Sequence, residues 1–291
     1  MINRFIVGLL AFLSSCVGGG GPTSPAPGPV TYTIGAPYQI GGEWQYPQEF
    51  ASYDTTGLAV ISQGPASGFT ADNEVYNPDD VAAASPVLPL PSIVTITNLV
   101  NGYSVQVRVN DRGPDIPGRV IAVTPHVASL LNFPSGGVVE VEVKLDSQAS
   151  AALQGSLGAG PQVQAAPVSG ITSQSLAAPG STQTNGAAQQ LLPADNSGPQ
   201  NQVPQLTGQV TITTPEPGPL WVRISGFGSV AGARPTVWKL YGMSTKIVPV
   251  MGDNRTFWAV ETGPYYSVEE ADTALQQVLG QGLSGPEIVV R

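Results

Sequence analysis

The chain has 291 residues, of which 11% are charged, and it contains 35 glycines, 28 prolines and a formal net charge of −9. This length suits two modest domains, and the turn-rich composition favours β-rich domains with flexible connections. The chain is net negative and does not have the excess of basic residues that nucleic-acid binding needs, so we expect no nucleic acid among the partners.

The first residues have the pattern of a bacterial export signal. Arg4 is followed by an apolar run over residues 5–13, which is too short to span a bilayer. The run leads into Leu13-Ser14-Ser15-Cys16, which holds the only cysteine of the chain and resembles a lipobox. The resemblance implies a signal peptide over residues 1–16 and a lipid anchor on Cys16. An ordinary signal peptide with an incidental cysteine is the alternative.

The residue after that cysteine bears on location. It is Val17 rather than aspartate. By the sorting rule of such lipoproteins, this implies a lipid-anchored protein of the Gram-negative outer membrane that faces the periplasm. Residues 17–49 are predicted to be a tether, because GGGGPTSPAPGP at 18–29 is too poor in apolar groups to fold. Ordered structure is expected to begin near Phe50.

Residues 50–146 have the pattern of a β domain. Residues 93–97 and 105–109 are β-branched and alternating, and Asn101-Gly102 between them predicts a hairpin turn. Residues 138–145 (VVEVEVKL) predict a further strand. A short helix is expected after Thr124, which can cap it, with Pro125 in the first turn.

Residues 147–218 differ in composition from the segments on either side. They consist mostly of Gln, Ala, Ser, Gly and Pro without visible periodicity, which predicts a disordered linker.

Order is expected to resume over residues 219–291. Strands are predicted at 220–224, 246–251, 256–261 and 287–290, with a weak helix at 235–241 and a second helix that starts at Ser267 and stops at Gly280. The order β-α-β-β-α-β predicts a small split-βαβ, ferredoxin-like domain.

Several ordered motifs in the β domain resemble the rare lipoprotein A family. They are Thr70-Ala71-x-x-Glu74-x-Tyr76, Leu88-Pro89-Leu90-Pro91-Ser92, Val107-Arg108-Val109-Asn110-Asp111-Arg112-Gly113-Pro114 and Gly118-Arg119-Val120-Ile121. The resemblance implies a six-stranded double-psi β-barrel. Residues 219–291 resemble, more loosely, a sporulation-related repeat (SPOR) domain.

The resemblance also implies an activity, that of an endolytic lytic transglycosylase of peptidoglycan. Such an enzyme cuts the glycan without water, because the C6 hydroxyl of the sugar attacks and leaves a 1,6-anhydro-MurNAc end. One carboxyl group then suffices as general acid and base, whereas ordinary glycosidases use two. The implied substrate is glycan without stem peptides at the division septum, with septal proteins as further partners. We expect no cofactor and no metal.

Two carboxylates match functional positions of the family, Glu74 and Asp111, and are the catalytic candidates. Asn110, Arg112 and Ser85 in the barrel are candidates for substrate binding, as are Val222, Ile224 and Trp258 in the C-terminal domain. From the residues alone, Asp111 could instead pair with Arg112 or Arg119 and hold the turn.

The chain departs from the family at several positions of the site. Ser85 stands where the family has a histidine, Ile61 and Ser62 replace a Trp-Tyr pair, and Ala122 replaces an aspartate. A catalytically degenerate, glycan-binding envelope lipoprotein is therefore the alternative function. A scaffold lipoprotein that binds a partner protein is a third.

Overall fold

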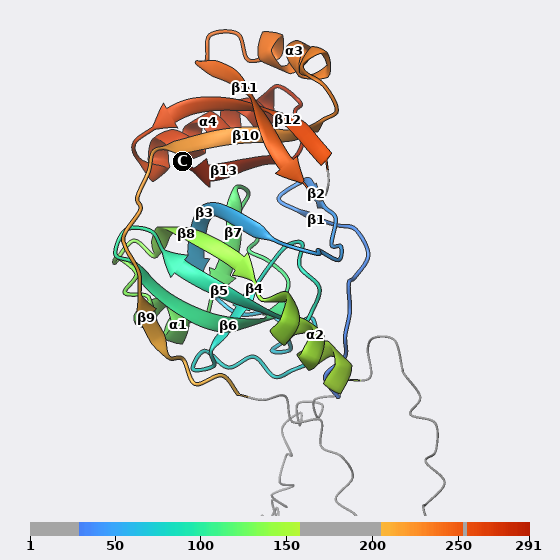
Figure 1. Ribbon diagram of the computed structural model, residues 1–291, viewed down its shortest axis with the longest axis vertical. Coiled ribbons are helices and arrows are strands. Elements are labelled where there is room, and N and C mark those ends of the chain that lie inside the picture. Colours follow the sequence, from blue (N-terminus) through green and yellow to red (C-terminus); the bar gives the residue numbers. More distant parts are fainter. Residues whose placement is uncertain (1–28, 158–204, 253–254) are drawn as a thin grey trace, which may run out of the picture.

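The computed structural model describes residues 29–157, 205–252 and 255–291 (Figure 1). The predicted signal peptide, Cys16 and the middle of the predicted linker lie outside these residues. Among the described helices, none has both the length and the apolar character needed to cross a membrane.

Six strands close into a barrel, as predicted. They are β3 (Asp54–Ile61), β4 (Ala82–Ala84), β5 (Ser92–Asn98), β6 (Tyr103–Asp111), β7 (Arg119–Val123) and β8 (Val138–Leu145). The strand order is β4-β7-β3-β8-β5-β6, and β6 also pairs with β4, which closes the ring. The pairs β3–β7 and β4–β6 are parallel and the other pairs are antiparallel. This mixed six-stranded barrel fits the double-psi architecture.

Alternation along the strands fills the barrel. Val94, Ile96, Val107, Val109 and Val141 are completely buried in one apolar cluster. Successive side chains of a strand point to opposite faces, so these residues share the interior. Full burial of a Val or Ile side chain is worth about 1.5–3 kcal/mol, which makes this cluster the main stabilising feature of the domain.

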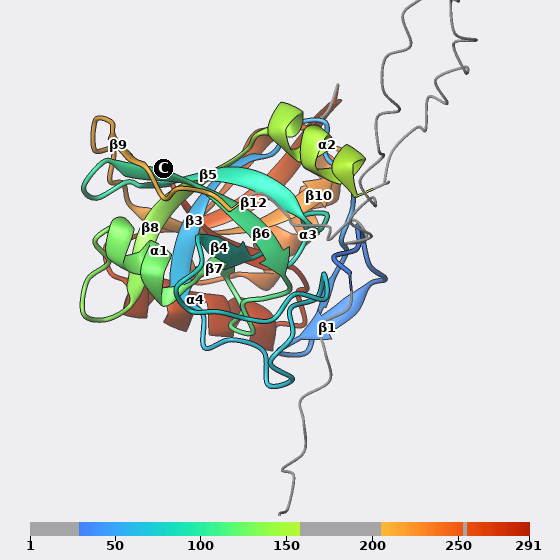
Figure 2. The same cartoon turned by 90° about the horizontal axis from the view of Figure 1, so that it is seen from below.

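The predicted helix beside the barrel is α1 (Pro125–Leu130). The Thr124 hydroxyl accepts a hydrogen bond from the Val127 N–H, as the cap prediction requires. Figure 2 shows α1 and a second helix, α2 (Ser147–Ser156), on opposite sides of the barrel.

The C-terminal domain has the predicted split-βαβ order. It consists of β10 (Leu220–Phe227), α3 (Val230–Lys239), β11 (Thr245–Gly252), β12 (Arg255–Tyr265), α4 (Val268–Gly280) and β13 (Pro286–Val290). The sheet order is β11-β12-β10-β13, and all pairs are antiparallel. Side chains of α3 and α4 share one apolar cluster with Val222, Ile224 and Val260, so both helices cover the same face of the sheet.

Two predicted boundaries are wrong. Structure begins before Phe50, because a hairpin of β1 (Tyr38–Ile40) and β2 (Glu43–Gln45) forms and Thr33 pairs with Leu90. Helix α3 begins five residues before Pro235, because Ser229 caps it by accepting from the Gly232 N–H. A proline is favoured in the first turn of a helix, but here it lies inside α3.

The ends of the predicted linker are also structured. Helix α2 packs on β5, where the Ser150 hydroxyl bonds the Ile93 backbone and Leu153 contacts the Ile93 side chain. Strand β9 (Val210–Ile212) pairs with the start of β6. Gly102 makes this approach possible, because a Cβ there would clash with the Thr213 carbonyl oxygen.

The C-terminal domain rests on the barrel through the edge strand β13 (Figure 1). Leu58 and Leu99 of the barrel belong to the apolar cluster of the C-terminal domain. The Thr56 hydroxyl donates to the Val290 carbonyl at 2.7 Å and accepts from its N–H at 3.2 Å. The two domains therefore share buried contacts in addition to their chain connection.

Candidate active site

Asp111 is the last residue of β6, where the strand turns sharply. Its Oδ1 accepts hydrogen bonds from the Ala71 N–H at 2.9 Å and from the Arg112 N–H at 2.8 Å. Gly113 follows with φ of +132°, a conformation that favours glycine. Strand, turn and two N–H donors thus fix this carboxyl group. Among the described residues Oδ2 accepts no hydrogen bond, so it is available to a proton or a substrate oxygen.

Asp111 lines a cleft of about 270 Å³ at this end of the barrel. The walls come from the end of β3 and the turn after it, from β4 and β7, and from the turn between β6 and β7. Burial raises the pKa of Asp111 above its usual value, while the N–H donors and the Arg112 charge act against the rise and the Asp115 charge adds to it. A partly buried carboxyl group with a raised pKa can hold a proton for transfer.

Glu74 has a different environment. Its Oε2 accepts from Arg108 Nη2 at 2.6 Å and from Asn110 Nδ2 at 2.7 Å. Arg108 and Asn110 lie two residues apart on β6 and so present their side chains on one face. Glu74 is not among the residues that line the Asp111 cleft. Both carboxylates flank the turn at 70–74, but only Asp111 faces the cleft.

Arg112 holds the backbone in place. Its guanidinium donates to the carbonyls of Leu88, Ser85 and Ile34, which ties the N-terminal segment to the loop before β5. No ion pair joins Asp111 to Arg112 or Arg119 in the described part of the chain, so the ion-pair alternative for Asp111 is not supported. Arg112 lines the cleft, but both of its terminal nitrogens already donate to these carbonyls.

The polar candidates Ser85 and Asn110 are buried, and their side chains are bonded within the barrel. Ser85 is 1% exposed, and its hydroxyl accepts from the N–H groups of Val87 and Leu88. Asn110 is 5% exposed and donates to Glu74. In this structure the Ser85 side chain holds a turn and the Asn110 side chain holds a carboxylate.

Three of the four positions at which the chain departs from the family pattern line the cleft, and Ser85 does not. Ile61, Ser62 and Ala122 all line it together with Asp111. They come from β3, the turn after it and β7, which are far apart in sequence. The structure therefore brings these three positions together with Asp111, and this chain has small or apolar side chains at all three.

Two acidic residues near the site escaped the sequence reasoning. Asp115 lines the cleft with Asp111. Asp72 is completely buried, and its Oδ1 accepts from the Thr70 hydroxyl at 2.7 Å. Burial, followed by the Glu74 charge, raises the pKa of Asp72 to about 7. Asp72 lies between Thr70 and Glu74 in a quoted motif, but its burial left no signal in the sequence.

The predicted contacts of the C-terminal domain lie mostly in its core. Val222 is completely buried and Ile224 is 5% exposed, both facing the helices. Neither side chain is exposed to a glycan in this structure. Trp258 is half-buried on β12, opposite Phe227.

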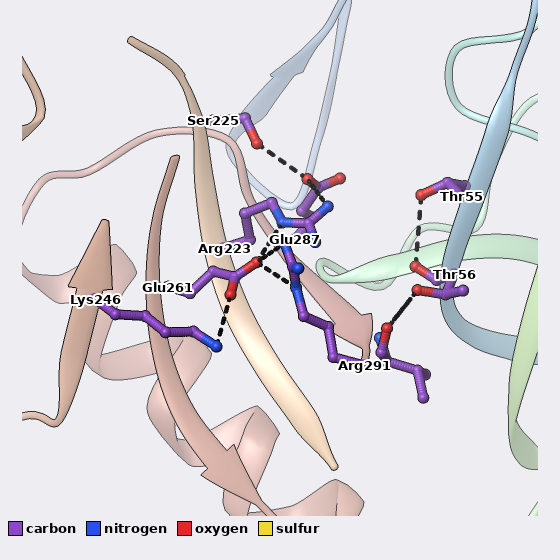
Figure 3. A network of polar contacts seen from close by, with 9 residues as sticks. Thr55, Thr56, Arg223, Ser225, Lys246, Glu261, Glu287 and Arg291 are labelled. Atoms are coloured by element: carbon purple, nitrogen blue, oxygen red, sulfur yellow. Dashed lines mark hydrogen bonds and ion pairs between the residues drawn. The ribbon is translucent and has the colours of Figure 1, made fainter. Parts of the chain in front are cut away.

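The sheet face away from the helices carries a charged cluster. There the completely buried carboxylate of Glu261 binds Arg223, Lys246 and Arg291 (Figure 3). Lys246 Nζ also lies 3.4 Å from the ring centroid of Trp221, in a cation–π contact. This face carries three cations and an aromatic ring beside one central acid. In the described residues, no three His, Cys, Asp or Glu side chains are grouped to hold a metal ion.

Comparison with known proteins agrees with the barrel fold. Residues 61–143 match a double-psi β-barrel family model described as lytic transglycolase. The endolytic peptidoglycan transglycosylase RlpA of Escherichia coli K12 is 32% identical over 219 residues, which cover 72% of this chain and 57% of that protein. The proteins of the same name from Rickettsia bellii and Salmonella typhimurium are 36% and 37% identical over 39% of this chain, covering 52% and 30% of their own lengths. The chain thus spans less than two thirds of these relatives.

Proposed function

The chain belongs to the rare lipoprotein A (RlpA) family through its barrel, and from this premise we propose that it is an endolytic lytic transglycosylase that cuts peptidoglycan glycan strands. Asp111 carries the proposal, because of the two carboxyl groups that line the barrel cleft it is the partly buried one, and one of its oxygens is uncommitted. Its Oδ2 protonates the leaving glycosidic oxygen. It then takes the proton of the C6 hydroxyl as that oxygen attacks the anomeric carbon.

A single carboxyl group can both supply and accept the one proton that this reaction moves. The leaving oxygen gains one proton, the attacking hydroxyl loses one, and the same carboxyl group serves both steps. No water enters, and the product carries a 1,6-anhydro ring. Glu74 acts by position, since its bonds to Arg108 and Asn110 fix the turn whose Ala71 N–H binds Asp111.

The site of action is proposed from the sequence. The lipobox-like segment supports anchoring of Cys16 in the Gram-negative outer membrane, with the protein facing the periplasm. Cell division is the process in which peptide-free glycan would be met, and septal proteins are candidate partners. The C-terminal domain would bind such glycan through the sheet face that carries Trp221, Arg223 and Lys246, since the other face is packed against helices.

One observation favours a second candidate function, a glycan-binding relative without turnover. The cleft lining offers Asp111, Arg112 and Asp115 as its charged groups, and Ser62 and Ala122 are small. An imidazole or a second buried carboxylate that could share the proton transfer is not part of this lining.

Product analysis separates the two functions. The purified protein is incubated with peptide-free glycan strands, and the ends are analysed by mass spectrometry. Soluble fragments with 1,6-anhydro ends, absent for the Asp111→Asn variant, support the transglycosylase. Reducing ends would indicate hydrolysis, and retained binding without any products would indicate the glycan-binding relative.

A further inference from the structure

A second cavity, of about 240 Å³, lies between the barrel and the C-terminal domain. Its walls come from the β1–β2 hairpin, the start of β3, the turn between β6 and β7, and the start of β13. Pro114 and Ile116 line both this cavity and the Asp111 cleft. The two spaces therefore adjoin across a single turn.

One wall of the cavity contains a buried donor without an acceptor. The Arg119 side chain is 5% exposed, and its two terminal nitrogens bind Asp272 at 2.7 Å each. Its Nε is buried and has no hydrogen-bond partner among the described residues. An unpaired buried N–H group is destabilising. Arg119 lines the cavity, so this wall is a guanidinium whose terminal nitrogens are already paired with Asp272.

The other walls add acceptors and an aromatic ring. Glu43 and Glu287 line the cavity from the hairpin and from β13. Trp44, also in the lining, is 53% exposed and offers its ring to a ligand. Aromatic surface with a few polar groups around it is the usual lining of a small-molecule site. A pyranose ring matches it, with C–H groups for the ring and hydroxyls for the acceptors.

The charge and the volume of the cavity restrict the class of ligand further. Asp272 already neutralises Arg119 and Arg223 lies 3.7 Å from Glu287, so among the described residues Glu43 is the cavity carboxylate without a cationic partner. Carboxylated and phosphorylated ligands are repelled, whereas a neutral sugar is not. The volume is below the range of about 300–1,000 Å³ for drug-sized ligands, which suits a single ring.

We propose that this cavity between the domains is a subsite for one neutral pyranose of the N-acetylhexosamine class, on the same glycan strand whose scissile bond lies in the Asp111 cleft. The identity of the sugar rests on the proposed function. The strand passes from one space to the other over Pro114 and Ile116. The C-terminal domain then forms part of the substrate path of the barrel.

A calorimetric titration tests the subsite. The probe is the neutral trisaccharide of N-acetylglucosamine, titrated into the purified chain and into Trp44→Ala. Loss of the ring contact is expected to weaken binding about tenfold. Tyr46→Ala is the matched control, because Tyr46 is 61% exposed on the same hairpin but does not line the cavity. Thr55→Trp, which fills the cavity from the barrel side, is expected to give the same loss as Trp44→Ala.

The outcomes separate this proposal from the proposed function. If Trp44→Ala and Thr55→Trp bind the trisaccharide as tightly as the unaltered chain, or if the unaltered chain does not bind it, the subsite is overturned. If the unaltered chain cuts no glycan but binds the trisaccharide in a way that depends on Trp44, the subsite proposal stands and the transglycosylase proposal fails. If Trp44→Ala cuts glycan normally and binds the trisaccharide as tightly as the unaltered chain, the transglycosylase proposal stands and the subsite proposal fails.

Discussion

Arg119 at the start of β7 and Asp272 on α4 are joined by two parallel hydrogen bonds of 2.7 Å across the domain interface. The arginine side chain is 5% exposed and the aspartate side chain 38%. A bidentate pair of this kind is directional, and removal of the aspartate leaves a buried cation. The pair therefore fixes the C-terminal domain at one orientation on the barrel.

Asp272→Ala is expected to destabilise the protein by about 2 kcal/mol, between the values for exposed and for fully buried pairs. Urea unfolding measures the change. The double variant Arg119→Met with Asp272→Ala is the control, since it leaves no buried charge without a partner and should recover part of the loss. Equal stability of Asp272→Ala and the unaltered chain would show that the pair does not hold the interface.

Asp72 predicts a pH dependence of stability. Its pKa is raised to about 7 in the folded protein, from an ordinary value of 3.8. The folded state thus binds more protons than the unfolded state between these pH values, so stability falls as pH rises from about 4 to about 7. Asp72→Asn removes this fall and should be more stable than the unaltered chain at pH 8, by about 4 kcal/mol.

The measurement for Asp72 is the difference in unfolding free energy between variant and unaltered chain at pH 4 and pH 8. Asp79→Asn at an exposed position is the control and should show no such difference. If the difference in unfolding free energy between Asp72→Asn and the unaltered chain is the same at pH 4 and pH 8, the proposed role of this carboxyl group is contradicted.

Arg112→Ala should free the N-terminal segment. Its guanidinium satisfies the carbonyls of Leu88, Ser85 and Ile34, and hydrogen bonds from a charged donor are worth about 1.5–3 kcal/mol. Faster hydrogen exchange is expected at the Thr33 amide, which donates to the Leu90 carbonyl at 2.7 Å. The exposed Arg234 supplies the control variant Arg234→Ala. Unchanged exchange at Thr33 in Arg112→Ala would contradict the clamp.

Gly102→Ala should detach β9 from the barrel. Gly102 has φ of +76°, and an added Cβ would meet the Thr213 carbonyl. Gly68 has φ of +75° with nothing within 4 Å of the added atom, so Gly68→Ala carries the same backbone strain without the clash. Exchange of the Thr213 amide, which donates to the Gly102 carbonyl, should rise only in Gly102→Ala. Similar exchange in both variants would indicate backbone strain alone.

Local patterns predicted the elements of the fold. Alternation in residues 93–97, 105–109 and 138–145 identified β5, β6 and β8, and Thr124 and Ser267 marked the starts of α1 and α4. The hairpin at β1 and β2 was missed because its stability comes from contacts with distant loops. The same holds for α2 and β9, whose polar sequences order only against the barrel.

The site was harder to predict than the fold. The sequence placed Asp111 at the end of a strand. It did not show that the side chains of Arg112 and Ser85 bind backbone groups. Alternation on β10 separates Val222 and Ile224 from Arg223, yet it does not say which face the helices cover. The burial of Asp72 and the cavity between the domains depend on segments far apart in sequence, which a local pattern cannot join.

The most direct measurement is the rate of 1,6-anhydro end formation on peptide-free glycan by the unaltered chain, Asp111→Asn and Glu74→Gln. We expect Asp111→Asn to lose a factor of about 10² to 10⁴, the usual contribution of general acid–base catalysis. Glu74→Gln keeps the size of the side chain and should lose less, because Glu74 acts by holding the turn beside Asp111. Full activity of Asp111→Asn would contradict the account, since the chemistry would then lie outside the barrel cleft.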